Sequence, residues 1–182
     1  MKVLIADDHA LVRQALRQLL DDEELGLAKN DHALSFIEAD GFDAALEGLA
    51  AALSARLPKR TRATIAKDLV RLNAAFGTAH MDLDALYRHD EEFHRRYVVA
   101  AGGLRLVAMH DSIKPQAERY IRMYIGLLSS DVSSSVREHE AVIEAIANGK
   151  PAAAERAVRE NWRHATDRIA RVIDLAGELG QG

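Results

Sequence analysis

The sequence predicts an all-α protein, a bundle of six to seven helices preceded by a short β-α appendage. Only three prolines, Pro58, Pro115 and Pro151, interrupt the 182 residues. Alanine, leucine, arginine and glutamate, which are all strong helix formers, dominate the rest. From about residue 34 onward, apolar residues recur at the i, i+3, i+4 and i+7 spacing of amphipathic helices. Together these observations favour helices packed on helices around a single core.

The individual elements follow from the positions of the apolar stripes and the residues that interrupt them. Residues 2–6 are the one clear strand candidate, a helix pattern follows to residue 20, and residues 27–39 read as a connector. Gly77 is expected to end one helix, and the serines before Val136 are expected to cap another. The expected helices of the bundle are 42–57, 61–76, 82–101, 104–128 with a kink at Pro115, 136–147 and 151–175, and residues 177–182 are expected to form a flexible tail.

Composition and charge exclude several classes of protein. The net charge is −4 and the sequence pI is about 6.1, which does not fit an autonomous nucleic-acid-binding domain with a basic face. The absence of cysteine excludes disulfides and Cys-ligated zinc and is compatible with the reducing cytoplasm, where we expect the protein to be. No apolar run reaches the roughly 18 residues of a membrane span, and no signal-peptide pattern begins the chain, so no membrane partner is expected.

Polar side chains lie on the apolar stripes of three expected helices. Asp90 and His94, four residues apart, both fall on the stripe of helix 82–101. His139 lies on the stripe of helix 136–147, and Asn161 on that of the last helix. A carboxylate that points inward is costly unless it is paired or binds a metal. The pattern therefore indicates a metal site, with a buried ion pair and a hydrogen-bonded core histidine as the alternatives.

Further candidates lie close to these stripes. His164 is three residues beyond Asn161 and could reach the same helix face. His110 lies near the stripe of helix 104–128, as core or as the wall of a pocket. Tyr120 and Tyr124 are one helical turn apart on the same helix, and we interpret them as core residues or as the lining of a ligand pocket.

Residues 40–176 resemble the FadR-type C-terminal ligand-binding domain, the FCD domain, of GntR-family transcription regulators. The resemblance implies an all-helical bundle in which one Asp and three His bind a divalent metal, here Zn²⁺, Ni²⁺ or Mn²⁺, that helps to anchor a small organic acid effector. Asp90, His94 and His139 match three of these ligands, and counting on from His139 without a gap places Asn161 at the fourth, so that Asn161 and His164 both remain candidates. Four segments carry the match in family order: Leu46–Arg56, Asp90–His94 (D-x-x-F-H), Ala100–Leu106 with Gly103 in place of the usual Asn, and Glu138–Ile146 followed by Gly149.

The same resemblance implies a role in transcription regulation by effector sensing. Regulators of this family carry an N-terminal winged helix-turn-helix, but residues 1–40 supply no recognition helix with basic flanks. We therefore expect contact with DNA only through a missing or separate DNA-binding domain, which would read an effector-induced population shift. The sequence leaves the oligomeric state open, a homodimer included.

The first 20 residues resemble the opening strand and helix of a response-regulator receiver. Asp7 and Asp8 would match its acidic Mg²⁺-binding pair. The resemblance ends there, because the region in which the phosphoacceptor Asp is expected reads Ala-Ala-Ala-Leu-Ser-Ala-Arg at residues 50–56. We assign residues 1–26 to a receiver-like fragment without phosphotransfer activity, and a truncated receiver-like signalling protein is an alternative function.

A helical metalloenzyme is the second alternative. Glu91 and His94 form an E-x-x-H element of the kind found in di-iron carboxylate bundles, which need two such elements and two further Glu residues. No second E-x-x-H faces the first, and no convincing general base accompanies it. We therefore expect no enzymatic activity.

Overall fold

The computed structural model describes the backbone of residues 31–79, 82–101, 103–114 and 132–179, and the side chains of residues 41–79, 82–101, 103–114 and 132–168. This part of the chain is helical and contains no strand, which confirms the predicted all-α class. The predicted β-α fragment of residues 1–26 lies outside the described residues. The helices are α2 (Asp31–Ala55), α3 (Lys59–Thr78), α4 (Leu83–Ala100), α6 (Val132–Ala147) and α7 (Pro151–Leu179), with a further helical segment at 104–114.

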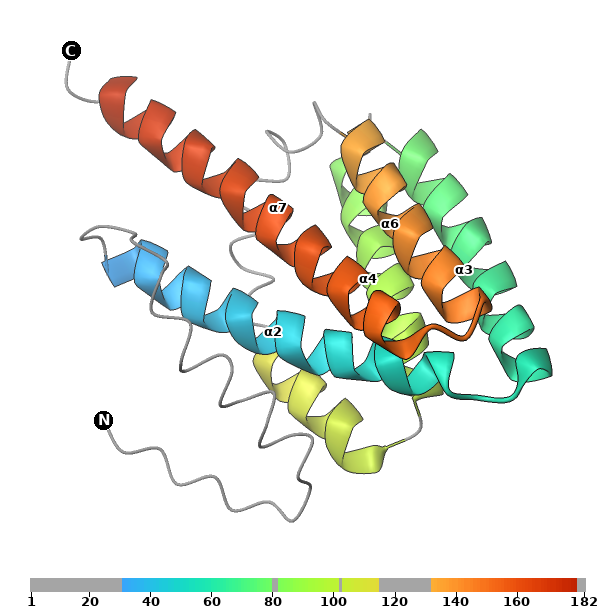
Figure 1. Cartoon of the computed structure of the whole chain (residues 1–182). Coiled ribbons are helices and arrows are strands. Elements are labelled where there is room, and N and C mark those ends of the chain that lie inside the picture. Colours follow the sequence, from blue (N-terminus) through green and yellow to red (C-terminus); the bar gives the residue numbers. More distant parts are fainter. Residues whose placement is uncertain (1–30, 80–81, 102, 115–131, 180–182) are drawn as a thin grey trace, which may run out of the picture.

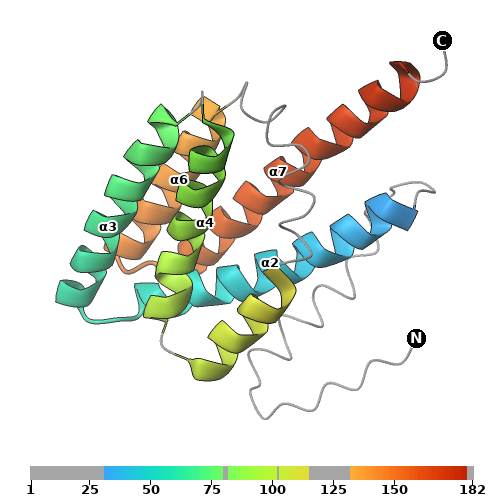
Figure 2. The ribbon, with the colours of Figure 1, turned by 180° about the vertical axis from the view of Figure 1, so that it is seen from behind.

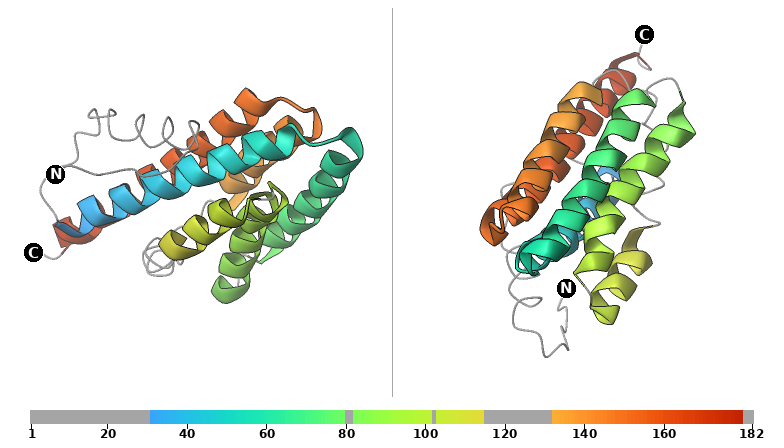
Figure 3. Two further views of the ribbon diagram at one scale, coloured as in Figure 1. Left: turned by 90° about the horizontal axis from the view of Figure 1, so that it is seen from below. Right: turned by 90° about the vertical axis from the view of Figure 1, so that its right-hand side faces the viewer.

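The helices form a bundle in which α2 and α7 lie side by side and run in opposite directions (Figure 1). Helix α6 packs against both α7 and α3, and α3 packs against α4. Seen from behind, segment 104–114 lies beside α2 (Figure 2). Figure 3 shows α3, α4 and α6 side by side, with α3 in contact with both of the others. No described helix is both long and apolar enough to cross a membrane.

Small residues allow α2 and α7 to approach closely. Ala50 and Ala51 of α2 and Ala154 of α7 are fully buried in the main hydrophobic core. A side-chain carbon built at Gly48 would lie 3.3 Å from Cγ of Glu155 on α7, a contact so tight that the Glu155 side chain would have to shift. Larger core side chains come from the other helices, with Phe93 and Tyr97 of α4 at the centre. The close approach places the middle of α2 deep in the bundle.

Helix α2 begins at Asp31, eleven residues before the expected start at Phe42. The prediction of a connector at 27–39 is therefore wrong for residues 31–39, which are helical. No proline interrupts the segment, and a single glycine, Gly41, destabilises a helix by only about 1 kcal/mol relative to alanine. At the other end of the chain α7 continues to Leu179, past the expected end at 175, so residues 177–179 of the predicted tail are helical as well.

Helix α6 also begins earlier than predicted. Its first residue is Val132, so the serines at 133–135 lie inside the helix and do not cap it. Val132 is buried with Phe76, Leu86 and Tyr87 in a second apolar cluster, and this burial outweighs the small intrinsic preference of serine for non-helical positions. The expected cap Gly77 lies within α3, which ends at Thr78.

The connection between α6 and α7 is a tight turn that depends on Gly149. Gly149 has a φ of 65°, a left-handed conformation that glycine adopts without steric cost. The Lys150 N–H donates to the Ala145 carbonyl at 3.0 Å, and the Gly149 N–H donates to that of Ile146 at 3.1 Å, which satisfies the end of α6. Pro151 then begins α7, as the sequence predicts.

Arg62 ties this turn to the connection between α2 and α3. Its Nη1 donates to the Leu57 carbonyl at 2.7 Å, and its Nε donates to the Ala147 carbonyl at 3.4 Å. A side-chain carbon at Gly149 would lie 2.8 Å from the Arg62 guanidinium. Arg62 therefore joins the two inter-helical connections at one end of the bundle.

Candidate metal centre

Asp90, His94 and His139 come together between α4 and α6. One ligand atom from each lies within 4.8 Å of the others. Asp90 Oδ1 lies 3.4 Å from His139 Nε2 and 4.0 Å from His94 Nε2. The two histidines are buried, whereas 29% of the Asp90 side chain is exposed. The group thus sits at the edge of the core, with Asp90 on its solvent side.

His139 is held so that one ring nitrogen is left free. Asn73 Nδ2 donates to the Val136 carbonyl at 3.1 Å, which leaves Asn73 Oδ1 to accept from His139 Nδ1 at 3.0 Å. The neutral ring then carries its lone pair on Nε2, which is buried and has no hydrogen-bond partner among the described residues. Burial, together with the nearby His94, lowers the pKa of His139 well below its usual value, so the ring stays neutral.

Aromatic packing fixes the plane of the same ring. Phe93 stacks on His139 with the ring centroids 4.0 Å apart and the planes 14° from parallel. Phe93 also meets His94 edge-on at 5.5 Å. Because Phe93 is fully buried at the centre of the main core, the orientation of both imidazoles depends on core packing.

His94 is oriented by a carboxylate from α2. Its Nδ1 donates to Glu47 Oε2 at 2.5 Å, and Glu47 is fully buried. The same oxygen accepts hydrogen bonds from Tyr97 Oη at 3.0 Å and from Trp162 Nε1 at 2.8 Å. With its Nδ1 committed to Glu47, His94 presents Nε2 toward Asp90.

Electrostatics keep this carboxylate charged. Burial raises the pKa of Glu47, but the charges of His94 and Lys114 and hydrogen bonds from the two neighbouring histidines more than offset burial and lower the pKa well below its ordinary value. Burial lowers the pKa of His94, and Glu47 in turn reverses that effect and raises it. His94 and Glu47 are therefore a buried, hydrogen-bonded pair of opposite charge when His94 is protonated.

The residues present fit a divalent cation. Metal-binding histidines almost always donate their second N–H to a carboxylate, carbonyl or water, as His94 does to Glu47, and His139 to the Asn73 amide oxygen. Two ligands at about 2.1 Å from a tetrahedral ion lie about 3.4 Å apart, the separation between His139 Nε2 and Asp90 Oδ1. The partnerless Nε2 of His139 is the buried polar atom that such an ion would satisfy.

The two candidates for a fourth ligand both lie beside Glu138. Asn161 is buried and its Nδ2 donates to Glu138 Oε2 at 3.0 Å. His164 is 40% exposed, its Nδ1 donates to Glu138 Oε1 at 3.0 Å, and its Nε2 accepts from Arg163 at 3.0 Å. Because both ring nitrogens of His164 have partners, this arrangement leaves it no lone pair for a metal. The hydrogen bond from Asn161 to Glu138 uses its Nδ2, so its Oδ1 is the atom that could bind a metal.

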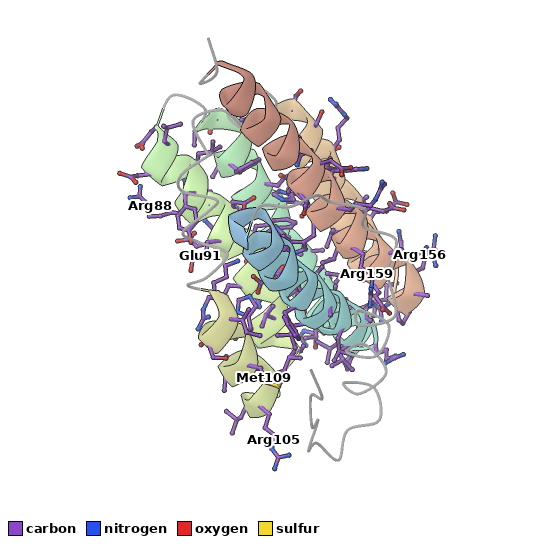
Figure 4. All side chains as sticks on the ribbon, turned by 90° about the vertical axis from the view of Figure 1, so that its left-hand side faces the viewer. Arg88, Glu91, Arg105, Met109, Arg156 and Arg159 are labelled. Carbon is purple, nitrogen blue, oxygen red and sulfur yellow. The ribbon has the colours of Figure 1, made fainter. Side chains whose placement is uncertain are left out.

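His110 is buried as expected, but it belongs to a different group of side chains. Its Nε2 lies 3.1 Å from Glu47 Oε1, and Lys114 Nζ lies 3.5 Å from the same oxygen. Charged side chains elsewhere, such as Arg88, Glu91 and Arg105, extend away from the bundle (Figure 4). The buried charged group around Glu47 differs from them in this respect. The predicted pocket residues Tyr120 and Tyr124 lie outside the described residues.

Asp43, Glu47 and Lys114 were not predicted from the sequence as site residues. All three are buried, and Asp43 and Glu47 lie four residues apart on the inner face of α2. The available signal was the position of Glu47 on the stripe of Leu46, Leu49, Ala50 and Leu53, where it matches Asp90 in being a carboxylate on an apolar face.

Comparison with known proteins identifies the bundle. The family model of the FCD domain matches residues 42–164, more than half of the chain. No curated protein and no solved structure matches the chain. The matched range contains α3, α4 and α6 in full, most of α2, and all three residues that meet between α4 and α6. The chain therefore belongs to the FCD domain family, the C-terminal effector-binding domains of GntR/FadR-type regulators.

Proposed function

We propose that this effector domain binds a small organic acid through a divalent cation, Zn²⁺, Ni²⁺ or Mn²⁺, held by Asp90, His94 and His139, with Asn161 as the fourth protein ligand. The observation that carries the proposal is the buried Nε2 of His139, which has no hydrogen-bond partner among the described residues and faces Asp90 Oδ1 at 3.4 Å. A bound cation would supply a Lewis-acidic centre for a carboxylate. Nitrogen and oxygen donors of this kind suit all three metals.

The residues of the chain have separate tasks in this proposal. His139 and His94 would hold the cation with nitrogens whose direction is fixed by Asn73 and Glu47. Asp90 would neutralise part of the positive charge of the cation. Because its side chain is partly exposed, the organic acid would approach the cation from the Asp90 side. The remaining positive charge would bind the effector carboxylate.

The same contacts offer a route for signalling. Glu47 belongs to α2, His94 to α4 and Trp162 to α7, and all three meet at one carboxylate oxygen. A shift of His94 on effector binding would therefore alter the packing of α2 against α7. A DNA-binding domain that contacts this effector domain would read the population shift, and the contacts with DNA would be its own.

Metal-dependent binding of carboxylates is the test. After treatment with a chelator, added Zn²⁺, Ni²⁺ or Mn²⁺ should raise the melting temperature, because the folded state binds the ion and the unfolded chain largely does not. At a hundred times the Kd this gain corresponds to about 2.7 kcal/mol. Mono-, di- and tricarboxylates, titrated by calorimetry, should bind only to the metal-loaded protein, and His139→Ala should abolish both effects.

His89→Ala is the matched control, because His89 is a partly exposed histidine near Glu92 on α4, the helix that also carries Asp90 and His94. It should keep the metal-dependent gain in melting temperature. If the wild-type protein melts at one temperature with and without metal, or if His139→Ala gains as much as His89→Ala, the cluster is a structural polar network and the proposal fails.

Asn161→His should strengthen metal binding. The change puts an imidazole at a buried position that contacts Glu138, the sequence neighbour of His139, and imidazole is a stronger ligand than an amide oxygen for these metals. We expect the Kd for Zn²⁺ or Ni²⁺ to fall by about tenfold or more, or ~1.4 kcal/mol for each factor of ten, measured by competition with a chelating dye. His164→Ala should leave the Kd unchanged, since both of its ring nitrogens are engaged elsewhere. A loss of affinity in His164→Ala with no gain in Asn161→His would make His164 the fourth ligand.

A further inference from the structure

A second group of ligand-type side chains lies between α2 and the helical segment 104–114. Asp43, Glu47 and His110 each place one ligand atom within 4.8 Å of the others. All three are buried, with exposed fractions of 0%, 0% and 1%. They share no residue with the Asp90–His94–His139 group, although Glu47 contacts both groups through its two oxygens.

Asp43 is the unusual member of this group. In the described part of the chain neither of its carboxylate oxygens has a hydrogen-bond partner, although both are buried. A buried, unpaired carboxylate costs several kcal/mol, so proteins retain one only where something compensates for it. Burial and the neighbouring charge of Glu47 raise the pKa of Asp43 to about 6.

The neighbouring donors are already committed to Glu47. Its Oε2 accepts hydrogen bonds from His94, Tyr97 and Trp162. Its Oε1 lies 3.1 Å from His110 Nε2 and 3.5 Å from Lys114 Nζ. Lys114 pairs with Glu47, and no hydrogen bond joins it to either Asp43 oxygen in the described part of the chain. The carboxylate of Asp43 therefore faces the cluster without a cation of its own.

We propose that Asp43, Glu47 and His110 form a second divalent-cation site, separate from the first. Two ligands at about 2.1 Å from an ion that lie 3.1 Å apart, as His110 Nε2 and Glu47 Oε1 do, enclose an angle of about 95°, close to that of octahedral coordination. The ion would replace the proton between these two atoms and would give Asp43 its missing partner. Two carboxylates and one imidazole make a harder set than that of the first site, so Mn²⁺ suits it well.

Lys114 is the natural competitor for this ion. Its ammonium group lies 3.5 Å from Glu47 Oε1, and its side chain is 10% exposed, so it connects the cluster to the surface. A lysine on a flexible four-carbon stem can withdraw toward solvent when an ion enters. Removing the ammonium should therefore favour the ion.

The experiment counts bound ions on the full chain with Mn²⁺ as the probe. Equilibrium dialysis with metal analysis should find two Mn²⁺ per chain in the wild-type protein. It should find one in Asp43→Asn, one in His139→Ala and none in the double variant. Lys114→Met should lower the Kd of the second ion by about tenfold or more while leaving the first unchanged.

The variants are chosen so that folding does not obscure the result. Asp43→Asn is isosteric and removes an uncompensated charge, so the metal-free variant should melt no lower than wild type, and His110→Gln provides an independent loss of the same site. One ion in both the wild-type protein and Asp43→Asn, or two in both, would overturn the proposal. Since His139→Ala removes only the first ion, failure of the first site and failure of the second give different counts.

Discussion

Replacing Glu47 with alanine should lower the free energy of unfolding by about 3–5 kcal/mol, because removing one partner of a buried charged network leaves the others unpaired. Glu47 accepts hydrogen bonds from His94, Tyr97 and Trp162 and faces Lys114, all of them buried. A typical domain is stable by only 5–15 kcal/mol, so the loss should be visible as a large drop in the urea midpoint. Chemical denaturation of the metal-free protein measures it without interference from ion binding.

Glu155→Ala is the matched control for this substitution. Glu155 lies on α7, is 38% exposed, and pairs with Arg159 at 3.3 Å. Surface pairs of this kind contribute about 0–1 kcal/mol. Equal losses in Glu47→Ala and Glu155→Ala would mean that the buried network does not stabilise the fold.

Phe93→Ala should destabilise the protein by about 3–5 kcal/mol and weaken metal binding as well. The side chain is fully buried at the centre of the main core, so its removal leaves a cavity. It also removes the ring that stacks on His139 at 4.0 Å and holds that imidazole in place. The two effects can be separated by measuring the free energy of unfolding without metal and the Kd for Zn²⁺ at a temperature where the variant is folded.

Phe42→Ala provides the comparison for the loss of a phenyl ring. Phe42 lies on α2 and is 36% exposed, and its removal should cost less than about 1 kcal/mol and leave the Kd unchanged. Phe93→Leu keeps a large apolar side chain in the core without a ring to stack. If its Kd matches that of wild type, core packing alone orients His139 and the stacking contact has no separate role.

Helical periodicity was enough to predict the fold class and the two buried histidines. His94 and His139 could be recognised because each is a polar residue on an otherwise apolar face, and the direction of a side chain on a helix follows from its position in the sequence. Helix boundaries were less predictable. The serines at 133–135 suggested a break, but the burial of Val132 beside Phe76, a contact between distant segments, decided the start of α6.

The buried carboxylates of α2 could not be predicted in the same way. A charged residue is stable inside a protein only when donors from elsewhere surround it, and the Trp162 indole that bonds to Glu47 lies 115 residues further along the chain. Local patterns carry no information about such a partner. The position of Glu47 on an apolar stripe indicates burial, but the partners that make the burial of Asp43 and Glu47 possible come from α7 and segment 104–114.

The guanidinium of Arg62 has a mechanical consequence for the whole bundle. By bonding to the carbonyls of Leu57 and Ala147 it joins the connection that follows α2 to the end of α6. The tight turn at Gly149 links that end to the start of α7, so α2 and α7 are held together at this end of the bundle. The other ends of these two helices, at Asp31 and Leu179, lie on the side of the bundle away from the connections that Arg62 joins (Figure 1). Glu47 and Trp162 meet between the two ends. If α2 and α7 separated slightly at this contact, the displacement would increase along both helices and would be largest at their far ends.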